Sequence, residues 1–331
     1  MTPRRRIIPI FVPHAGCPNQ CVFCNQKRIS GSLFPVSEED VRFALSQADL
    51  SPGLEVAFYG GSFTAIPEEK QNALLEAVQP FRENGLVSSI RLSTRPDAID
   101  EGILERLKIF GVRTIELGTQ SMCDDVLMES GRGHTSQDTV NASRIIRKAG
   151  LSLILQMMTG LPGSSDEKDI YTARRIAELK PDGVRIYPTV IIRDTPLEEL
   201  WHAGKYAEHT VDDAVRVCAA ILPVFEEADI PVIRLGLNPT EELSHGAVAA
   251  GAYHPALGEL VRSRIWLEKA RILLRGVKSG EKVTLCTAER NISAVTGQHR
   301  GNIDVLVREF SLSELHIKAA DCGENDLFLL K

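Results

Sequence analysis

The stretch most informative about the fold runs from residue 7 to residue 24 and reads Ile7-Ile8-Pro9-Ile10-Phe11-Val12-Pro13-His14-Ala15-Gly16-Cys17-Pro18-Asn19-Gln20-Cys21-Val22-Phe23-Cys24. Its β-branched, apolar beginning predicts a strand over residues 7–13. Three cysteines follow, with three residues between the first two and two between the last two. Thiolates at this spacing can each bind one iron of a cubane iron–sulfur cluster and leave the fourth iron without a protein ligand. We therefore expect Cys17, Cys21 and Cys24 to hold a [4Fe-4S] cluster.

A structural zinc site is the competing interpretation of these cysteines. Zinc in such sites normally takes four protein ligands, and His14 could be the fourth. The aromatic Phe23 and the position of the loop directly after the first strand favour the cluster.

Beyond this loop, short β-branched runs alternate with longer segments of helical periodicity, which is typical of repeated βα units around a parallel sheet. The expected strands lie near residues 7–13, 54–60, 89–95, 114–120, 152–158 and 183–190, and the expected helices near residues 37–48, 67–83, 100–110, 136–149 and 166–179. The predicted fold class is α/β, an incomplete (βα)6 TIM-like barrel. Ligands of such folds bind at the carboxyl ends of the strands.

The rest of the chain predicts a second, smaller unit. A helix near residues 210–228 and a strand near residues 231–236 are expected to finish the barrel. The expected division is a barrel domain over 1–236, a linker or substrate-side loop over 237–260, and a small C-terminal α+β lobe over 261–331 that starts with a helix over 261–275.

Composition and charge narrow the class of protein. The chain has 331 residues, of which 43% are hydrophobic and 25% charged, as expected of one large α/β domain with a small appendage. No apolar run is long enough to span a bilayer, and Arg4 to Arg6 are not followed by the apolar segment of a signal peptide, so we expect a cytoplasmic protein.

The net charge is −6, with +5 in residues 1–36 and −13 in residues 37–244. The positive beginning suits an anionic substrate or, equally, a plain solvated surface.

Polar residues stand where the expected strands end. Paired glycines, Gly60 and Gly61, follow the second strand and leave the backbone open to a ligand. Arg95, Glu116 and Gln120 end the third and fourth strands, and we expect them at the mouth of the barrel beside the cysteines. Further along, Arg132 could pair with a carboxylate, and Arg185 and Tyr187 share one face of strand six by period-two alternation.

These motifs together resemble the radical SAM superfamily and, within it, the family of the Elongator catalytic subunit, which acts on wobble uridines of tRNA. The resembling segments are Gly60-Gly61-Ser62-Phe63-Thr64, Thr94-Arg95-Pro96-Asp97, Ile115 to Ser121, Arg132-Gly133-His134-Thr135, Ile186-Tyr187-Pro188-Thr189 and Glu199 to Tyr206. The resemblance covers about residues 7–235.

The resemblance implies a radical SAM enzyme that uses a [4Fe-4S] cluster to cleave S-adenosyl-L-methionine to a 5'-deoxyadenosyl radical. It implies cofactor contacts for Gly60, Gly61, Thr94, Arg95, Gln120 and Arg132, and it places Tyr187 and Tyr206 near the active site as catalytic candidates. It also implies reduced flavodoxin or ferredoxin as the electron donor and tRNA or another RNA as the substrate.

The sequence departs from the Elongator family in three respects. The spacing between Cys17 and Cys21 is that of the wider superfamily, and Arg185 stands where the family has Lys. The residues after the matched region show no acetyl-CoA pyrophosphate loop, so the acetyltransferase domain is not expected here.

Two alternatives to RNA modification stay open. One is a radical SAM enzyme for a small metabolite, like the coproporphyrinogen-dehydrogenase branch, which the isoelectric point of about 5.8 makes reasonable. The other is a non-catalytic RNA-binding protein with a structural metal site. Salt-dependent tRNA binding and S-adenosylmethionine cleavage would separate the three.

Overall fold

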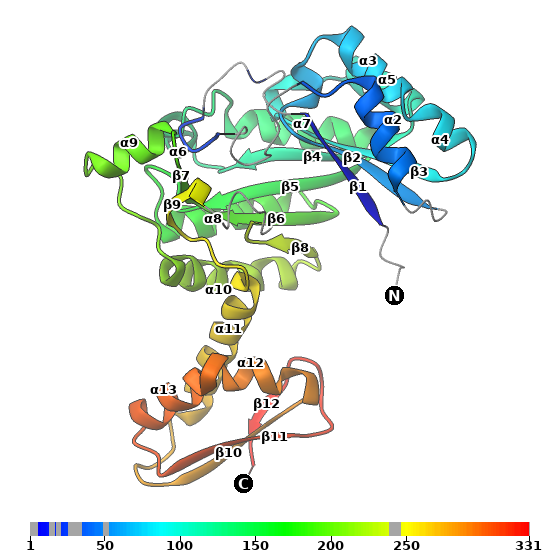
Figure 1. Ribbon diagram of the computed structural model, residues 1–331. Coiled ribbons are helices and arrows are strands. Elements are labelled where there is room, and N and C mark those ends of the chain that lie inside the picture. Colours follow the sequence, from blue (N-terminus) through cyan, green and yellow to red (C-terminus); the bar gives the residue numbers. More distant parts are fainter. Residues whose placement is uncertain are drawn as a thin grey trace.

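The structure is a computed structural model that describes residues 6–12, 17, 21–25, 35–48, 53–237 and 246–330. Its centre is a seven-stranded sheet in the order β1-β2-β3-β4-β5-β6-β8, in which all neighbours are parallel (Figure 1). The strands are β1 (Ile7–Val12), β2 (Leu54–Gly60), β3 (Val87–Thr94), β4 (Val112–Gln120), β5 (Ser152–Thr159), β6 (Gly183–Pro188) and β8 (Val232–Leu235). The sheet curls into a half-barrel, which confirms the predicted fold class.

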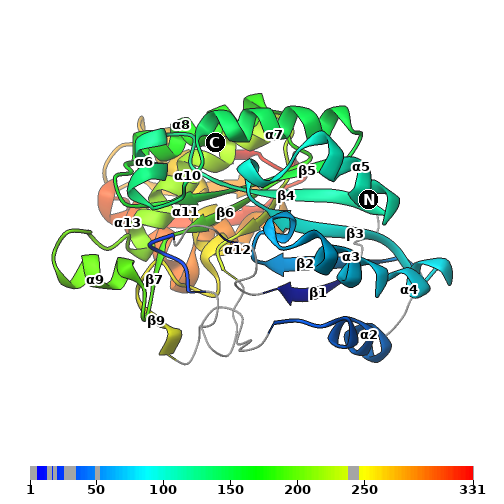
Figure 2. The same ribbon diagram turned by 90° about the horizontal axis from the view of Figure 1, so that it is seen from above.

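Helices cover the outer side of this sheet, and six of these seven begin within one residue of the predicted starts. They are α2 (Glu38–Gln47), α3 (Glu68–Glu76), α4 (Gln79–Glu83), α5 (Glu101–Ile109), α7 (Ser136–Lys148), α8 (Asp166–Glu178) and α10 (Val211–Glu227). A capping box joins Ser37 and Asp40 at the start of α2, since each side chain bonds the other's backbone N–H. Figure 2 shows α7 and α8 along one side of β4 and β5. None of the described helices is long and apolar enough to cross a membrane.

The predicted helix over 67–83 is wrong in one respect, because the structure divides it into α3 and α4. Pro80 has no N–H to donate to the carbonyl of Glu76, so the helical hydrogen bonds are interrupted there.

The predicted strand over 183–190 also ends early, at Pro188. The chain then forms β7 (Val190–Ile192), which pairs antiparallel with β9 (Val248–Gly251) in a separate two-stranded sheet. Two short helices, α6 (Asp124–Glu129) and α9 (Pro196–His202), were not predicted either. Each is short, so its periodicity is too brief to identify.

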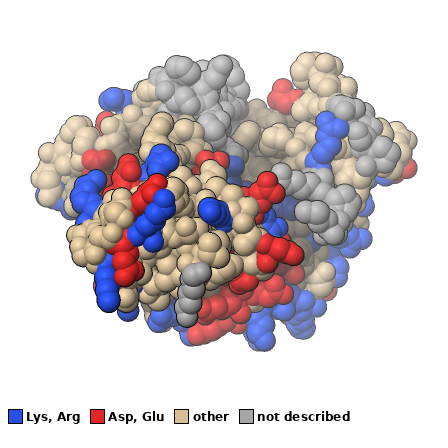
Figure 3. Space-filling view, turned by 90° about the horizontal axis from the view of Figure 1, so that it is seen from below, with Lys and Arg blue, Asp and Glu red and all other residues tan. Residues whose placement is uncertain are grey.

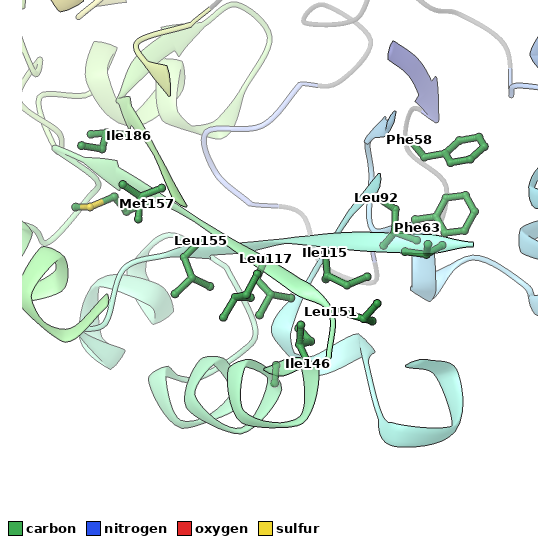
Figure 4. Packing of buried hydrophobic residues seen from close by; sticks show 14 of the residues in the cluster. Phe58, Phe63, Leu92, Ile115, Leu117, Ile146, Leu151, Leu155, Met157 and Ile186 are labelled. Carbon is green, nitrogen blue, oxygen red and sulfur yellow. The ribbon is translucent and has the colours of Figure 1, made fainter. Parts of the chain in front are cut away.

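The apolar core lies between the outer face of the sheet and the helices. Alternate strand residues point to this side, among them Ile115, Leu117 and Leu155, which are fully buried. Figure 4 shows these side chains packed with Ile146 of α7. The other alternate residues point to the inner, concave face, which is where the polar strand residues of the next subsection lie.

The C-terminal lobe is attached through one long helix, α11 (Leu257–Leu274). It contains β10 (Lys282–Thr287), α12 (Ile292–Thr296), α13 (Gly301–Glu309), β11 (Glu314–Ala319) and β12 (Leu327–Leu329), with the sheet order β11-β10-β12. Leu257 and Val261 belong to the barrel core, whereas Leu267 and Leu274 belong to the core of the lobe. The helix predicted over 261–275 therefore begins four residues earlier and spans both cores; the division into domains stays a prediction.

Candidate active site

The cysteine loop lies at the carboxyl ends of β1 and β2. Gly61 N donates to Val12 O at 3.0 Å, which joins the two strand ends. Beside them the Cys17 thiol donates to Ser62 Oγ at 3.7 Å. Val22 N donates to Ser130 O at 3.1 Å, so the segment with the other two cysteines is fixed to the residue that follows α6. This is the edge of the sheet at which a ligand was expected.

Arg132 connects this segment to the middle of the sheet. Its Nη1 donates to Cys21 Sγ at 3.4 Å, and its Nη2 donates to Gly118 O at 2.7 Å. A Cβ atom on Gly118 would stand 2.7 Å from Arg132 Nη2, so the guanidinium group occupies the space that the missing side chain leaves. The structure thus brings two predicted site residues, Arg132 and Cys21, into contact.

The donor set at this place suits an iron–sulfur cluster. It offers three thiols and a guanidinium group, and thiolates are the ligands that iron–sulfur clusters take. Within the described residues, no three metal-binding side chains are gathered into a metal site. His14, the proposed fourth ligand of the zinc alternative, lies outside the described residues.

Several buried polar atoms behind Arg132 have no hydrogen-bond partner within the described chain: Arg95 Nη1, Arg132 Nε, His134 Nδ1, Thr119 Oγ1 and Ser130 Oγ. Arg95 is 1% exposed and donates through Nε and Nη2 to Asp97 at 2.8 and 2.9 Å. Burial, with the positive charges of Arg132 and Arg95, lowers the pKa of His134 to about 4. Buried polar groups normally have partners, so these free atoms are available to a bound cofactor or to water.

The other predicted cofactor residues have defined surroundings. Gly60 has a φ of 107°, a backbone conformation that favours glycine. Gln120 follows a bulge in β4, has a φ of 65°, and accepts from Gln156 Nε2 at 3.5 Å. The hydroxyl of Thr94 lies 2.5 Å from that of Thr64. Cofactor contact by these residues stays a prediction.

A buried network of charges occupies the concave face. Glu116 accepts from Arg91 Nη1 at 2.8 Å, Arg185 Nε at 2.8 Å and Tyr59 Oη at 3.1 Å. Arg91 also donates to Glu55 through Nη2 at 2.7 Å. Two carboxylates therefore balance two guanidinium groups, and Glu55 and Glu116 are 1% and 2% exposed.

Sequence reasoning found Glu116 and Arg185 of this network but missed Tyr59, Arg91 and Glu55. Along each strand, every second side chain points to the concave face, and all five of these residues occupy such positions. The strand registers agree, since Ala57 pairs with Arg91 and Gln156 pairs with Arg185. That alternation was a signal of which residues share a face, although it does not show which face is concave.

The two predicted catalytic tyrosines lie in different surroundings. Tyr187 Oη accepts from Arg185 Nη1 at 3.5 Å, and burial raises its pKa, which keeps the hydroxyl protonated at neutral pH. Tyr206 Oη donates to Gly160 O at 2.6 Å, beside a cavity of about 270 Å³ that Asp169 and His209 also line. The ring of Tyr206 packs in an apolar cluster with Phe23 of the cysteine segment. The catalytic role of both tyrosines stays a prediction.

The comparisons with known proteins agree with this geometry. Residues 11–176 match the Radical SAM superfamily and residues 181–266 match the Radical_SAM C-terminal domain. The chain belongs to the radical SAM superfamily, and it is an enzyme of that class.

The similar curated proteins are more specific. Elongator complex protein 3 of Homo sapiens is 29% identical over 233 residues, which are 64% of this chain and 42% of that protein. A tRNA uridine(34) acetyltransferase of Methanocaldococcus jannaschii is 30% identical over 248 residues, 69% of this chain and 44% of that protein. The matched region thus spans less than half the length of these relatives.

Solved structures show the same fold. Elp3 of the archaeon Methanocaldococcus infernus has a TM-score of 0.63 and 23% identity, with coverage of 80% of this chain and 63% of the other. The coproporphyrinogen III oxidase HemN of Escherichia coli has a TM-score of 0.51 and 18% identity, with coverage of 68% and 53%.

Proposed function

We propose that Cys17, Cys21 and Cys24 hold a [4Fe-4S] cluster that binds S-adenosyl-L-methionine, and that the enzyme modifies tRNA. The observation that carries this proposal is the meeting of Cys17 with Ser62 and of Cys21 with Arg132 at the carboxyl edge of the half-barrel. When bound, the cluster supplies the electron that cleaves S-adenosyl-L-methionine to a 5'-deoxyadenosyl radical.

The chain's own residues bind and orient the reactants. Gly60 and Gly61 expose backbone to the methionyl part of the cofactor, and Arg95, Gln120 and Arg132, with Thr94 behind them, form the polar side of its pocket. Below this rim, the Glu116 network fixes the position of Arg185, which donates to the Tyr187 hydroxyl. A substrate group on the concave face would meet these fixed polar groups with little bulk water.

The names of the relatives favour RNA over the small-metabolite alternative, since several are tRNA uridine(34) acetyltransferases. The face shown in Figure 3 gives the RNA substrate no added support, because Lys and Arg are interspersed there with Asp and Glu. We place the enzyme in the cytoplasm, where thiols stay reduced, and assign reduced flavodoxin or ferredoxin as its electron donor.

The test measures one reaction product, 5'-deoxyadenosine, in the presence of different candidate substrates. The reconstituted protein is incubated without oxygen with S-adenosyl-L-methionine and dithionite, and 5'-deoxyadenosine is measured with bulk tRNA, with coproporphyrinogen III, or with neither. We expect tRNA, and not coproporphyrinogen III, to increase the yield of 5'-deoxyadenosine. We also expect tRNA binding to weaken as the salt concentration rises. Stimulation by coproporphyrinogen III, or no response to tRNA, would refute the RNA substrate.

A further inference from the structure

Arg132 is held in place by the fold rather than by a carboxylate. Its side chain forms no ion pair within the described part of the chain; its donors reach Gly118 O and Cys21 Sγ. Its backbone N donates to Leu127 O at 2.9 Å, and Gly131 and Gly133 on either side both have positive φ. The residue is 7% exposed. A guanidinium group stays protonated in proteins, so a positive charge that has no ion-pair partner among the described residues is fixed beside the Cys21 sulfur.

A fixed charge at a cysteine sulfur affects the two redox states of a bound cluster unequally. One electron from reduced flavodoxin or ferredoxin adds one negative charge to the site. A nearby positive charge and an N–H donor to sulfur stabilise the more negative state, and hydrogen bonds to sulfur are among the features that set cluster potentials.

We propose that Arg132 raises the reduction potential of the cluster through its contact with Cys21. This inference rests on the proposed cluster site and assigns Arg132 a role besides binding S-adenosyl-L-methionine. Arg132 is in this sense a positioning and tuning residue, because it acts on the iron through a cysteine ligand.

Three variants distinguish the effect of the charge of Arg132 on the reduction potential from the effect of its position. Arg132→Gln removes the charge, and Arg132→Lys keeps the charge but loses the two-pronged geometry. Gly118→Ala leaves Arg132 unchanged in chemistry but places a Cβ 2.7 Å from Nη2 and 3.0 Å from Gln120 Nε2, so the guanidinium group must shift. Arg106→Gln on α5 is the matched control, because Arg106 bonds Gln71 and Asn72 on the outer side of the sheet.

The measurement is the midpoint potential of the reconstituted cluster, followed by electron paramagnetic resonance without S-adenosyl-L-methionine. We expect the cluster in Arg132→Gln to be harder to reduce than in wild type. The equilibrium constant for its reduction should fall at least tenfold, which lowers the midpoint potential by about 59 mV for one electron. Arg132→Lys and Gly118→Ala should shift the potential less in the same direction, and Arg106→Gln should not shift it.

Equal potentials in wild type and Arg132→Gln, at equal iron content, would overturn the tuning role. Loss of iron from Arg132→Gln with a normal circular dichroism spectrum, and an unshifted potential in Gly118→Ala, would assign Arg132 to cluster assembly instead and also overturn it. Failure of the proposed function looks different, because then the wild-type protein itself binds no iron–sulfur cluster.

Discussion

The two faces of the central sheet are built from alternate residues of the same strands, yet they differ in almost every physical respect. The outer face is a continuous apolar core against the helices, with side chains such as Leu117 and Leu155 fully buried. The concave face carries buried carboxylates and guanidinium groups that bond one another, with Glu116 at the centre. Burial of apolar surface is the main source of folding stability, whereas a buried ion pair contributes little net stability. The outer face therefore stabilises the barrel, and we propose that the concave face serves binding and chemistry.

The largest effect on stability is expected on the outer face. Leu155→Ala removes a fully buried side chain from the core between β5 and the helices. We expect the free energy of unfolding to fall by about 4 kcal/mol, through lost burial and a cavity. Urea denaturation measures this change in the free energy of unfolding. A loss below about 1 kcal/mol would mean that the core at this position is loosely packed.

Removal of the central carboxylate tests the concave face. Glu116→Ala leaves Arg91 and Arg185 without a shared partner, and their side chains are only 14% and 15% exposed. We expect the free energy of unfolding to fall by about 3 kcal/mol. The loss would be larger if the two arginines were completely buried, but water reaches part of each side chain. The control is Glu101→Ala, which breaks an exposed ion pair with Lys148 and should leave the urea midpoint unchanged. Equal effects of the two substitutions would contradict a buried network.

The acid side of the pH profile tests the buried groups around Arg132. Because burial holds the pKa of His134 near 4, below its usual value of 6.5, the unfolded chain takes up a proton in this range while the folded protein does not. The His134 contribution is fully present above pH 6.5 and is lost as the pH falls toward 4, at about 1.4 kcal/mol per pH unit. Stability of wild type should thus fall more steeply over this range than that of His134→Asn. Parallel curves would show that His134 titrates normally.

The smallest change in stability is expected when the network is replaced rather than broken. Glu116→Met combined with Arg185→Met removes one charge of each sign and fills the space with apolar groups. We expect the free energy of unfolding to stay within about 1 kcal/mol of wild type, while product formation on tRNA is lost. Retained activity would show that the network has a structural role only.

Local patterns were enough to predict the strands of the central sheet and most of the longer helices, but not the short elements α6, α9, β7 and β9. The strand and helix types were right because periods of two and 3.6 residues are properties of short segments. The pairing of β7 with β9 could not be foreseen, because it joins residues 56 to 61 positions apart and no local signal specifies it.

The positions of some candidate site residues were also predictable, while their roles stay predictions. Motif positions identified Cys21 and Arg132, which the structure places in contact. Arg91 and Tyr59 were missed, because alternation shows which residues share a face but not which face is concave. That depends on where the helices pack, a long-range property of the whole chain.

The most direct test of the account is whether these three cysteines hold a cluster that cleaves S-adenosyl-L-methionine. Wild type, a variant with Cys17, Cys21 and Cys24 all replaced by Ala, and the control Cys322→Ala are reconstituted without oxygen. Iron and sulfide per chain and 5'-deoxyadenosine after dithionite addition are then measured. We predict about four irons per chain and cleavage in wild type and Cys322→Ala, and neither in the triple variant. A triple variant that still binds iron and forms 5'-deoxyadenosine, or a wild type that does neither, would contradict the account.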